Sequence, residues 1–163
     1  MQVIRLPHAL MILSFFLFWG AYQALIPALC LRVPLKALDP GRGIYRLRQW
    51  ESAGLYRRLL LIRSWKHLLP DGAALFRRGF RKKRLASTDP GYLRLFMAES
   101  CRAELTHWLA IIPFWVFGFW APPFVIPLML AYAVAANAPC ILAQRYNRLR
   151  IAALLARGGA RLS

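Results

Sequence analysis

Residues 11–31 form a run of 21 residues without a charged side chain. At 1.5 Å per residue, a helix of this length spans the hydrocarbon core of a bilayer, which is roughly 30 Å thick. A secretory signal peptide has a shorter apolar core of about 7–15 residues, followed by a small-residue cleavage site. This run is longer, and Leu29 before Cys30 does not fit a lipoprotein-type cleavage site. We therefore expect an uncleaved transmembrane helix over residues 11–31.

The cations are spread unevenly along a chain that is also strongly apolar. Hydrophobic residues make up 59% of the sequence, yet the formal net charge is +17. Residues 32–104 contain 17 Lys and Arg, whereas residues 105–144 contain none. A soluble domain seldom combines these properties, but a membrane protein does, because its cations lie outside the lipid. No nucleic-acid motif accompanies the charge, so we expect anionic lipid or a phosphate-bearing substrate as the partner, and no nucleic acid.

The same charge pattern predicts an orientation in the membrane. Cytoplasmic loops carry the excess of Lys and Arg, and residues 32–104 form the most basic segment. We expect this loop and the tail, residues 144–163, in the cytoplasm and the N-terminus outside. The expected location is the inner (cytoplasmic) membrane of a bacterial cell, with several crossings.

A second apolar region, residues 105–143, is divided by Pro122 and Pro123. Prolines interrupt helices, so the region predicts a helical hairpin with its turn at this pair. The first arm, residues 105–120, has 16 residues and is short for a complete crossing. It is either a tilted helix extended by residues 98–104 or a re-entrant arm buried in protein.

Residues 51–69 carry one apolar stripe with helical spacing. The stripe recurs at steps of 4, 3, 3 and 4 and consists of Leu55, Leu59, Ile62, Trp65 and Leu69. A basic amphipathic helix of this kind is typical of a membrane surface. The predicted fold is therefore a single all-α integral membrane domain, residues 1–163, with about three transmembrane helices and one interfacial helix in the basic cytoplasmic loop.

Two polar segments, residues 99–108 and 137–148, are expected to meet at one face of the bilayer, where the hairpin begins and ends. Ionisable groups at such a depth are costly and are functional candidates by default. Glu104 and His107 are three residues apart, so they are neighbours on one helical face. A carboxylate there can orient the imidazole and stabilise its protonated form, which makes the pair a candidate general base. The alternative is a structural pair that packs the start of the helix.

Two further groups of residues have the chemistry of a site. His67 and Asp71 are four residues apart and form a second candidate base pair, or else part of a solvated basic face. Asn137 lies within an apolar run, where it either bonds a neighbouring helix or binds substrate. The three cysteines, Cys30, Cys101 and Cys140, show no metal-site or disulfide spacing, and we expect no metal and no cofactor.

Four motifs in this order resemble the glycosyl-4,4′-diaponeurosporenoate acyltransferase family. The motifs run from Trp65 to Gly72 (WKHLLPDG), from Arg102 to Trp108 (RAELTHW), from Asn137 to Pro139 (NAP) and from Gln144 to Arg150 (QRYNRLR). The last is long and specific, and the resemblance covers nearly the whole chain after the first helix. Outside the motifs, the sequence is richer in Arg, Ala and Pro than the family pattern.

The resemblance implies a small bacterial membrane enzyme of carotenoid biosynthesis. Such an enzyme esterifies a sugar hydroxyl of a glycosylated carotenoid, or of a related glycosylated terpenoid or glycolipid, with a fatty acyl group. Acyl-CoA or acyl carrier protein is then the expected acyl donor. Polar residues of the motifs are the candidates for binding substrate: Lys66, Arg102, Asn137, Gln144, Arg145, Asn147 and Arg148.

The implied mechanism needs a general base to take the proton of the sugar hydroxyl, with positive donors to stabilise the tetrahedral oxyanion. We expect His107, oriented by Glu104, as this base and His67 with Asp71 as the alternative. Arg102, Arg145, Asn147 and Arg148 are candidates for binding the donor phosphates or the oxyanion. Two other classes of function stay open, namely another lipid-modifying membrane enzyme such as a methyltransferase, and a non-catalytic scaffold of a pigment pathway.

Overall fold

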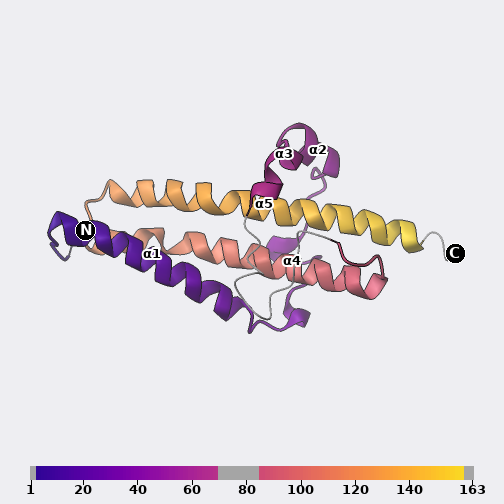
Figure 1. Ribbon diagram of the computed structural model, residues 1–163, viewed down its shortest axis with the longest axis horizontal. Helices are drawn as coiled ribbons and strands as arrows, with labels where there is room; N and C mark the ends of the chain where they lie inside the picture. The colour runs from indigo at the N-terminus through magenta and orange to yellow at the C-terminus, as the bar shows by residue number, and fades with distance from the viewer. Residues whose placement is uncertain (1–2, 70–84, 160–163) are drawn as a thin grey trace.

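The computed structural model describes residues 3–69 and 85–159, and all regular structure within these ranges is helical. Three long helices lie side by side, as Figure 1 shows: α1 (His8–Cys30), α4 (Pro90–Ile111) and α5 (Val125–Gly159). The shorter elements are η1 (Leu35–Ala37), η2 (Gly43–Tyr45), α2 (Ala53–Arg58), α3 (Ile62–Trp65), η3 (Lys66–Leu68) and η5 (Ile112–Phe119). The prediction of an all-α fold is confirmed for these residues.

Two of the long helices have the length and composition to cross a bilayer. They are His8–Cys30 and Val125–Gly158, and they expose large apolar side chains, such as Phe16 with 73% of its surface accessible. Apolar side chains in such numbers are stable on a surface when lipid covers it. The predicted first span thus exists as a helix, whereas the expected number of three crossings stays a prediction.

The hairpin turn lies beside the N-terminal end of α1. After Ile111 the chain tightens into the 3₁₀ helix η5, which has Pro113 in its first turn, and α5 begins at Val125 after the two prolines. The backbone N–H groups of Val3 and Ile4 donate to the carbonyl of Phe119, at 2.8 and 3.0 Å. The predicted turn at Pro122 and Pro123 is therefore confirmed, and the segment before α1 is tied to it.

Helix α5 continues without interruption beyond the predicted hairpin. It passes Asn137 and Pro139 and ends at Gly159, so residues 144–159 of the expected tail form its last part. Helix α4 begins at Pro90, where the Asp89 carboxylate caps the helix by accepting a hydrogen bond from the N–H of Tyr92. The first hairpin arm is thus the end of α4, which includes residues 98–104, followed by η5.

The prediction of one amphipathic helix over residues 51–69 is wrong. The segment is divided into α2, α3 and η3, because Leu61 adopts a left-handed backbone conformation with φ of 45° that a helix cannot contain. The break leaves Leu59 exposed, buries Ile62 against Tyr146, and lets the Trp65 indole donate to the carbonyl of Leu60 at 2.7 Å. Packing against α5 thus overrides the helical periodicity.

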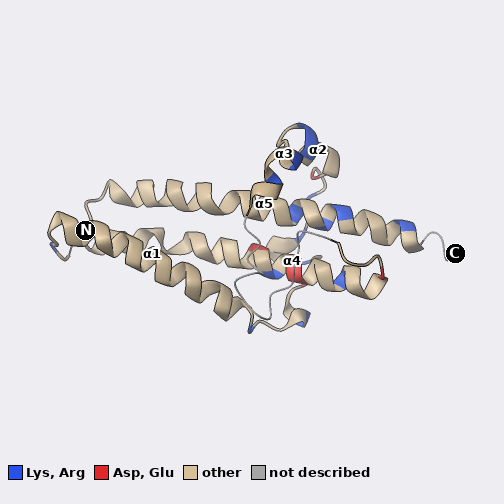
Figure 2. Cartoon of the chain, in the orientation of Figure 1, with Lys and Arg blue, Asp and Glu red and all other residues tan. Residues whose placement is uncertain are grey.

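The charged residues gather in one half of the molecule. Figure 2 shows Lys, Arg, Asp and Glu along the first two thirds of α4, along the C-terminal half of α5 and in the short helices beside them, whereas the half near the N-terminus has almost none. The apolar half holds a core of buried residues: Trp19, Phe117, Ala121, Val125 and Ala133. The protein thus has an apolar half and a polar half, and the polar half contains the candidate site.

Candidate active site

A buried ionic cluster joins α4 and α5 to the segment before α2. Glu104 of α4 pairs with Arg145 of α5 through Oε1 at 2.9 Å and with Arg148 through Oε2. Arg145 also pairs with Glu51, with Nη2–Oε1 at 2.5 Å and Nε–Oε2 at 3.0 Å, so that this contact is bidentate. The Tyr56 hydroxyl donates to Glu51 at 2.7 Å. We call these five residues the ionic cluster.

The arginines of the cluster also hold a loop by its backbone. Arg145 donates to the carbonyls of Ile44 and Arg46, at 3.0 and 3.1 Å. Arg148 donates to the carbonyl of Tyr45 at 3.2 Å. These contacts lie about a hundred residues apart in sequence, so the cluster closes the polar end of the fold.

Two features show how far the cluster is removed from water. The side chains of Glu104 and Arg148 are both 0% exposed. Within the part of the chain that the structure describes, Arg148 Nε and Nη1 are buried and make no hydrogen bond. Desolvating such charges costs free energy that only well-placed partners offset, so loss of either member leaves the other buried and uncompensated.

The ionisation of Glu51 and Tyr56 reflects their contact. Burial alone would raise the pKa of Glu51, but hydrogen bonds from Arg145, the Arg48 backbone and Tyr56 lower it on balance. Burial and the hydrogen bond to Glu51 raise the pKa of Tyr56. Glu51 is therefore an anion and Tyr56 a neutral donor at neutral pH.

His107 of α4 is paired with Asn137 of α5. The distance between His107 Nδ1 and Asn137 Oδ1 is 2.9 Å, and Asn137 Nδ2 donates to the carbonyl of Ala133 at 2.9 Å. The second bond fixes the amide, so its oxygen faces the ring. Because an amide oxygen only accepts, Nδ1 carries the proton and Nε2 is the basic nitrogen of the neutral ring.

The sequence suggested Glu104 as the group that orients His107. At Nδ1, the structure has Asn137 in that position, while the Glu104 carboxylate accepts from Arg145, from Arg148 and from the Trp108 indole, the last at 3.2 Å. The reason is tertiary packing, because two guanidinium groups outcompete a neutral ring for a buried carboxylate. Both Asn137 and His107 were candidates from sequence, but their pairing was not expected.

A second chain of polar contacts crosses α5. The Ser100 hydroxyl of α4 contacts the backbone and side-chain oxygens of Gln144, at 3.0 and 3.2 Å. Asn147 Nδ2 donates to the Gln144 side chain at 3.4 Å, and the Lys66 ammonium donates to Asn147 Oδ1. The structure thus connects the candidate residues Gln144, Asn147 and Lys66 with one another.

Lys66 and Arg102 have different surroundings. Burial and the charge of Arg150 lower the pKa of Lys66 to about 8. Arg102 pairs with Glu99 at 3.2 Å and donates to the carbonyls of Cys30 and Val33, at 2.5 and 2.7 Å. Cations at a helix C-terminus satisfy its free carbonyls, so Arg102 fixes the end of α1 against α4.

The second candidate base pair is only half described. His67 lies exposed in η3, while Asp71 lies outside the residues that the structure describes. The proposed pair of His67 and Asp71 therefore stays a prediction. Among residues 3–69 and 85–159, no group of three or more His, Cys, Asp and Glu is placed to hold a metal ion.

Sequence reasoning missed Glu51, Tyr56 and Arg150. The chain has six acidic residues against 23 Lys and Arg, so each acid is a candidate partner for a buried cation. That scarcity is the signal that would have drawn attention to Glu51. Its partner Arg145 is 94 residues away, and no local pattern predicts such a contact.

The fold and the site define a small helical protein with two helices of membrane-spanning length and a buried ionic cluster at its polar end. A model of the family described as glycosyl-4,4′-diaponeurosporenoate acyltransferase matches residues 41–157. The chain belongs to this family.

Curated relatives carry the same name. One from Staphylococcus haemolyticus (strain JCSC1435) is 35% identical over 135 residues, which cover 82% of this chain and 78% of the relative. Another from Staphylococcus aureus (strain MRSA252) is 32% identical over 140 residues, covering 85% of this chain and 84% of the relative. No solved structure matches the chain.

Proposed function

We propose that this chain is a membrane acyltransferase that esterifies a sugar hydroxyl of a glycosylated carotenoid with a fatty acyl group. The family match carries the proposal, because residues 41–157 include both the ionic cluster and the pair of His107 and Asn137. The relatives' shared name, glycosyl-4,4′-diaponeurosporenoate acyltransferase, supplies the acceptor class. A glycosylated carotenoid lies in the bilayer with its sugar at the interface, which suits a site at the polar end of two apolar helices.

The proposed location is the cytoplasmic membrane, with the basic half of the protein in the cytoplasm. The separation of charged and apolar halves in Figure 2 supports this orientation, since the excess of Lys and Arg stays inside. The contact of Val3 and Ile4 with Phe119 is consistent with it, because it joins the N-terminal segment and the hairpin turn at one end. Both would then lie on the outer side.

The proposed reaction uses a thioester donor, acyl-CoA or acyl carrier protein. The sugar hydroxyl attacks the thioester carbonyl carbon and passes its proton to a general base. Collapse of the tetrahedral intermediate breaks the C–S bond, and the base returns the proton to the leaving thiolate. An ester and a free thiol result, and no further reactant is needed.

His107 is our first choice for the base. Its Nδ1–H is held by Asn137, so the basic nitrogen Nε2 has a fixed direction. Glu104 is engaged by two arginines and acts, in this proposal, by holding α4 against α5. His67, in η3 beside α5, is the alternative base, and Asp71 is its proposed partner.

The candidates for binding the donor divide into two groups. The charged contacts of Arg102, Arg145 and Arg148 are with protein carboxylates, so a donor phosphate would have to displace these partners. We therefore propose a structural role for the three arginines. Lys66, with Gln144 and Asn147 beside it, is the better candidate, because no carboxylate of the described residues forms a salt bridge with it.

The test is to express the chain in a bacterial host that makes the glycosylated carotenoid but lacks an acyltransferase for it. Mass spectrometry of the extracted pigments should show a new species heavier by one fatty acyl group, and the His107→Ala variant should lose it. A product heavier by a methyl group would favour a methyltransferase. Unchanged pigments in the presence of folded protein would favour a scaffold.

A further inference from the structure

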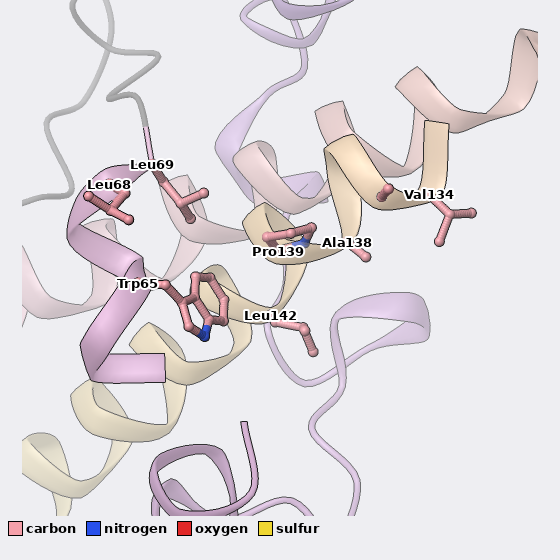
Figure 3. Close-up of a pocket in the computed structure, with 8 residues that line it drawn as sticks. Trp65, Leu68, Leu69, Val134, Ala138, Pro139 and Leu142 are labelled. Atoms are coloured by element: carbon pink, nitrogen blue, oxygen red, sulfur yellow. The ribbon is translucent and has the colours of Figure 1, made fainter. Parts of the chain in front are cut away.

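An apolar groove lies between the segment of η3 and helix α5. Its volume is about 500 Å³, within the range of roughly 300–1,000 Å³ that small-molecule sites occupy. Figure 3 shows Trp65, Leu68 and Leu69 facing Val134, Ala138, Pro139 and Leu142 across it. This lining is apolar and suits a hydrocarbon chain.

One end of the groove carries two cations. Trp65 and Leu142, which line the groove, also pack against the buried cluster of Tyr56, Ile62 and Tyr146, and Tyr146 lies one helical turn beyond Leu142 on α5. The Lys66 ammonium lies 5.4 Å and the Arg150 guanidinium 5.9 Å from the centre of the Tyr146 ring. Both distances are within the range of cation–π attraction, so the ring gathers two like charges at the groove's polar end.

Lys66, which is half-buried, and Arg150, which is exposed, differ from Arg102, Arg145 and Arg148 in forming no salt bridge with an acid of the described residues. Within residues 3–69 and 85–159, every salt bridge involves Arg42, Arg102, Arg145 or Arg148, and none involves Lys66 or Arg150. Their mutual repulsion contributes to the lowered pKa of Lys66. An anion placed between them would relieve this repulsion.

The wall of the groove includes a sequence neighbour of Asn137, the partner of the candidate base. Ala138 follows Asn137 directly, and successive residues of an α-helix diverge by about 100° around its axis. The partner of His107 and the wall of the groove therefore belong to neighbouring faces of the same turn of α5. Three of the four family-like motifs, those at 65–72, 137–139 and 144–150, contribute to the groove or its polar end.

We propose that this groove is the acyl-chain subsite for a fatty acyl-CoA donor, with Lys66 and Arg150 facing the donor's anionic part. The proposal rests on the proposed acyl transfer and locates its donor. An acyl-CoA combines one long hydrocarbon chain with several negative charges at the other end, which matches an apolar groove that ends in two unneutralised cations. It arrives from the aqueous side, where it meets these cations first.

The first test changes the length of the groove. The Ala138→Phe variant places a ring in it, while Ala136→Phe puts the same ring on an exposed face of α5 outside it. Both proteins, in nanodiscs with glycosylated carotenoid, are assayed with saturated acyl-CoA donors from octanoyl to stearoyl. We expect Ala138→Phe to shift the preferred donor to shorter chains, with about four-fold lost for each methylene excluded. The control should keep the wild-type profile, and identical profiles for the two variants would overturn the proposal.

The second test separates the cations from the groove. Lys66→Gln and Arg150→Gln should each raise KM for palmitoyl-CoA about ten-fold, since each removes a charged partner of the donor. The same variants should leave KM for palmitoyl-N-acetylcysteamine unchanged, because this thioester has no phosphate. Equal losses with both donors would assign the cations a structural role and overturn the proposed contact.

A third measurement does not depend on turnover. Binding of radiolabelled palmitoyl-CoA to nanodiscs should weaken in Lys66→Gln and Ala138→Phe but not in Ala136→Phe. If wild-type protein binds palmitoyl-CoA in this pattern without acylating the carotenoid, the proposed acceptor fails and the donor site stands. If phosphatidylglycerol in the nanodisc prevents binding as well as unlabelled palmitoyl-CoA does, the groove is a phospholipid site and the proposal fails.

Discussion

Glu104 and Arg148 form an ion pair in which neither side chain is exposed to solvent. The Glu104 carboxylate also pairs with Arg145, so one negative and two positive charges from α4 and α5 meet in a buried site. Such a group contributes little net free energy when complete but is costly to divide. It therefore makes the packing of α4 against α5 sensitive to single substitutions.

We expect Glu104→Gln to destabilise the protein by roughly 3–5 kcal/mol, because two arginines lose their charged partner in a buried site. Thermal unfolding in detergent measures the change. Asp39→Asn is the control, since Asp39 pairs with Arg42 on the surface, where such pairs contribute about 0–1 kcal/mol. Equal stability of the two variants would contradict the buried role of Glu104.

Replacement of His107 should separate catalysis from folding. His107→Ala should lower turnover by roughly 10²–10⁴-fold, the usual contribution of a general base, while the protein stays folded in the membrane. Asn137→Ala should lower turnover less, because the ring loses its fixed direction but keeps its basic nitrogen. Steady-state kinetics with purified protein gives both values.

If His67 is the base instead of His107, the expected order of the variants is reversed. If His67 only contacts substrate, His67→Ala should act mainly through KM. A large loss of turnover in His67→Ala and Asp71→Asn, with His107→Ala fully active, would move the catalytic centre to the segment beside α5. Full activity in all of these variants would reject both pairs.

The acyl-CoA affinity should depend on pH through Lys66. The folded-state pKa of Lys66 is lowered to about 8, so the ammonium loses its proton as pH rises through that value. KM for acyl-CoA should therefore increase between about pH 7 and 9, and Lys66→Arg should remove this dependence because Arg stays protonated. A parallel increase in Lys66→Arg would trace the effect to another group.

Because of Glu51, the stability of the protein should depend on pH in the acidic range. Its folded-state pKa is lowered, so its contribution is present above the pKa of the unfolded chain, about 4.3, and is lost as pH falls through the lower folded value. Glu51→Gln should thus be less stable than wild type at pH 7, and the difference should shrink below about pH 4. Unfolding temperatures measured across this range test the sign.

Topology can be mapped with fused reporters. A reporter fused after Ser163 should be found in the cytoplasm, and one fused before Met1 should be found outside. The reason is that the excess of Lys and Arg is expected on the cytoplasmic side. A C-terminus outside the cytoplasm would overturn the orientation and the access of a cytoplasmic donor to the groove.

The features predicted from sequence are those that neighbouring residues determine. The long apolar run before Cys30 and the two prolines of the hairpin turn define helices by composition and backbone chemistry alone. Hairpin geometry also places residues 99–108 beside 137–148, as the contact of Ser100 with Gln144 confirms.

The features that sequence did not predict depend on distant contacts. The apolar stripe does not indicate that Leu61 has a φ of 45°, so it does not predict a break there. The break becomes clear from the structure, where Ile62 and Tyr146 belong to one buried cluster. Likewise, Glu104 lies about one helical turn before His107 on α4 and is its local polar neighbour. Asn137 reaches the ring only because α5 packs against α4. Competition between local and tertiary partners decided both outcomes.

The bond between the segment before α1 and Phe119 has a consequence for biosynthesis. The first helix leaves the ribosome long before the residue that its N-terminal segment contacts has been translated. Until then the N–H groups of Val3 and Ile4 lack this acceptor, and α1 has been made without the helices that pack against it. Assembly around α1 can therefore be completed only after the hairpin has been translated, and a chain truncated before Phe119 would lack this contact.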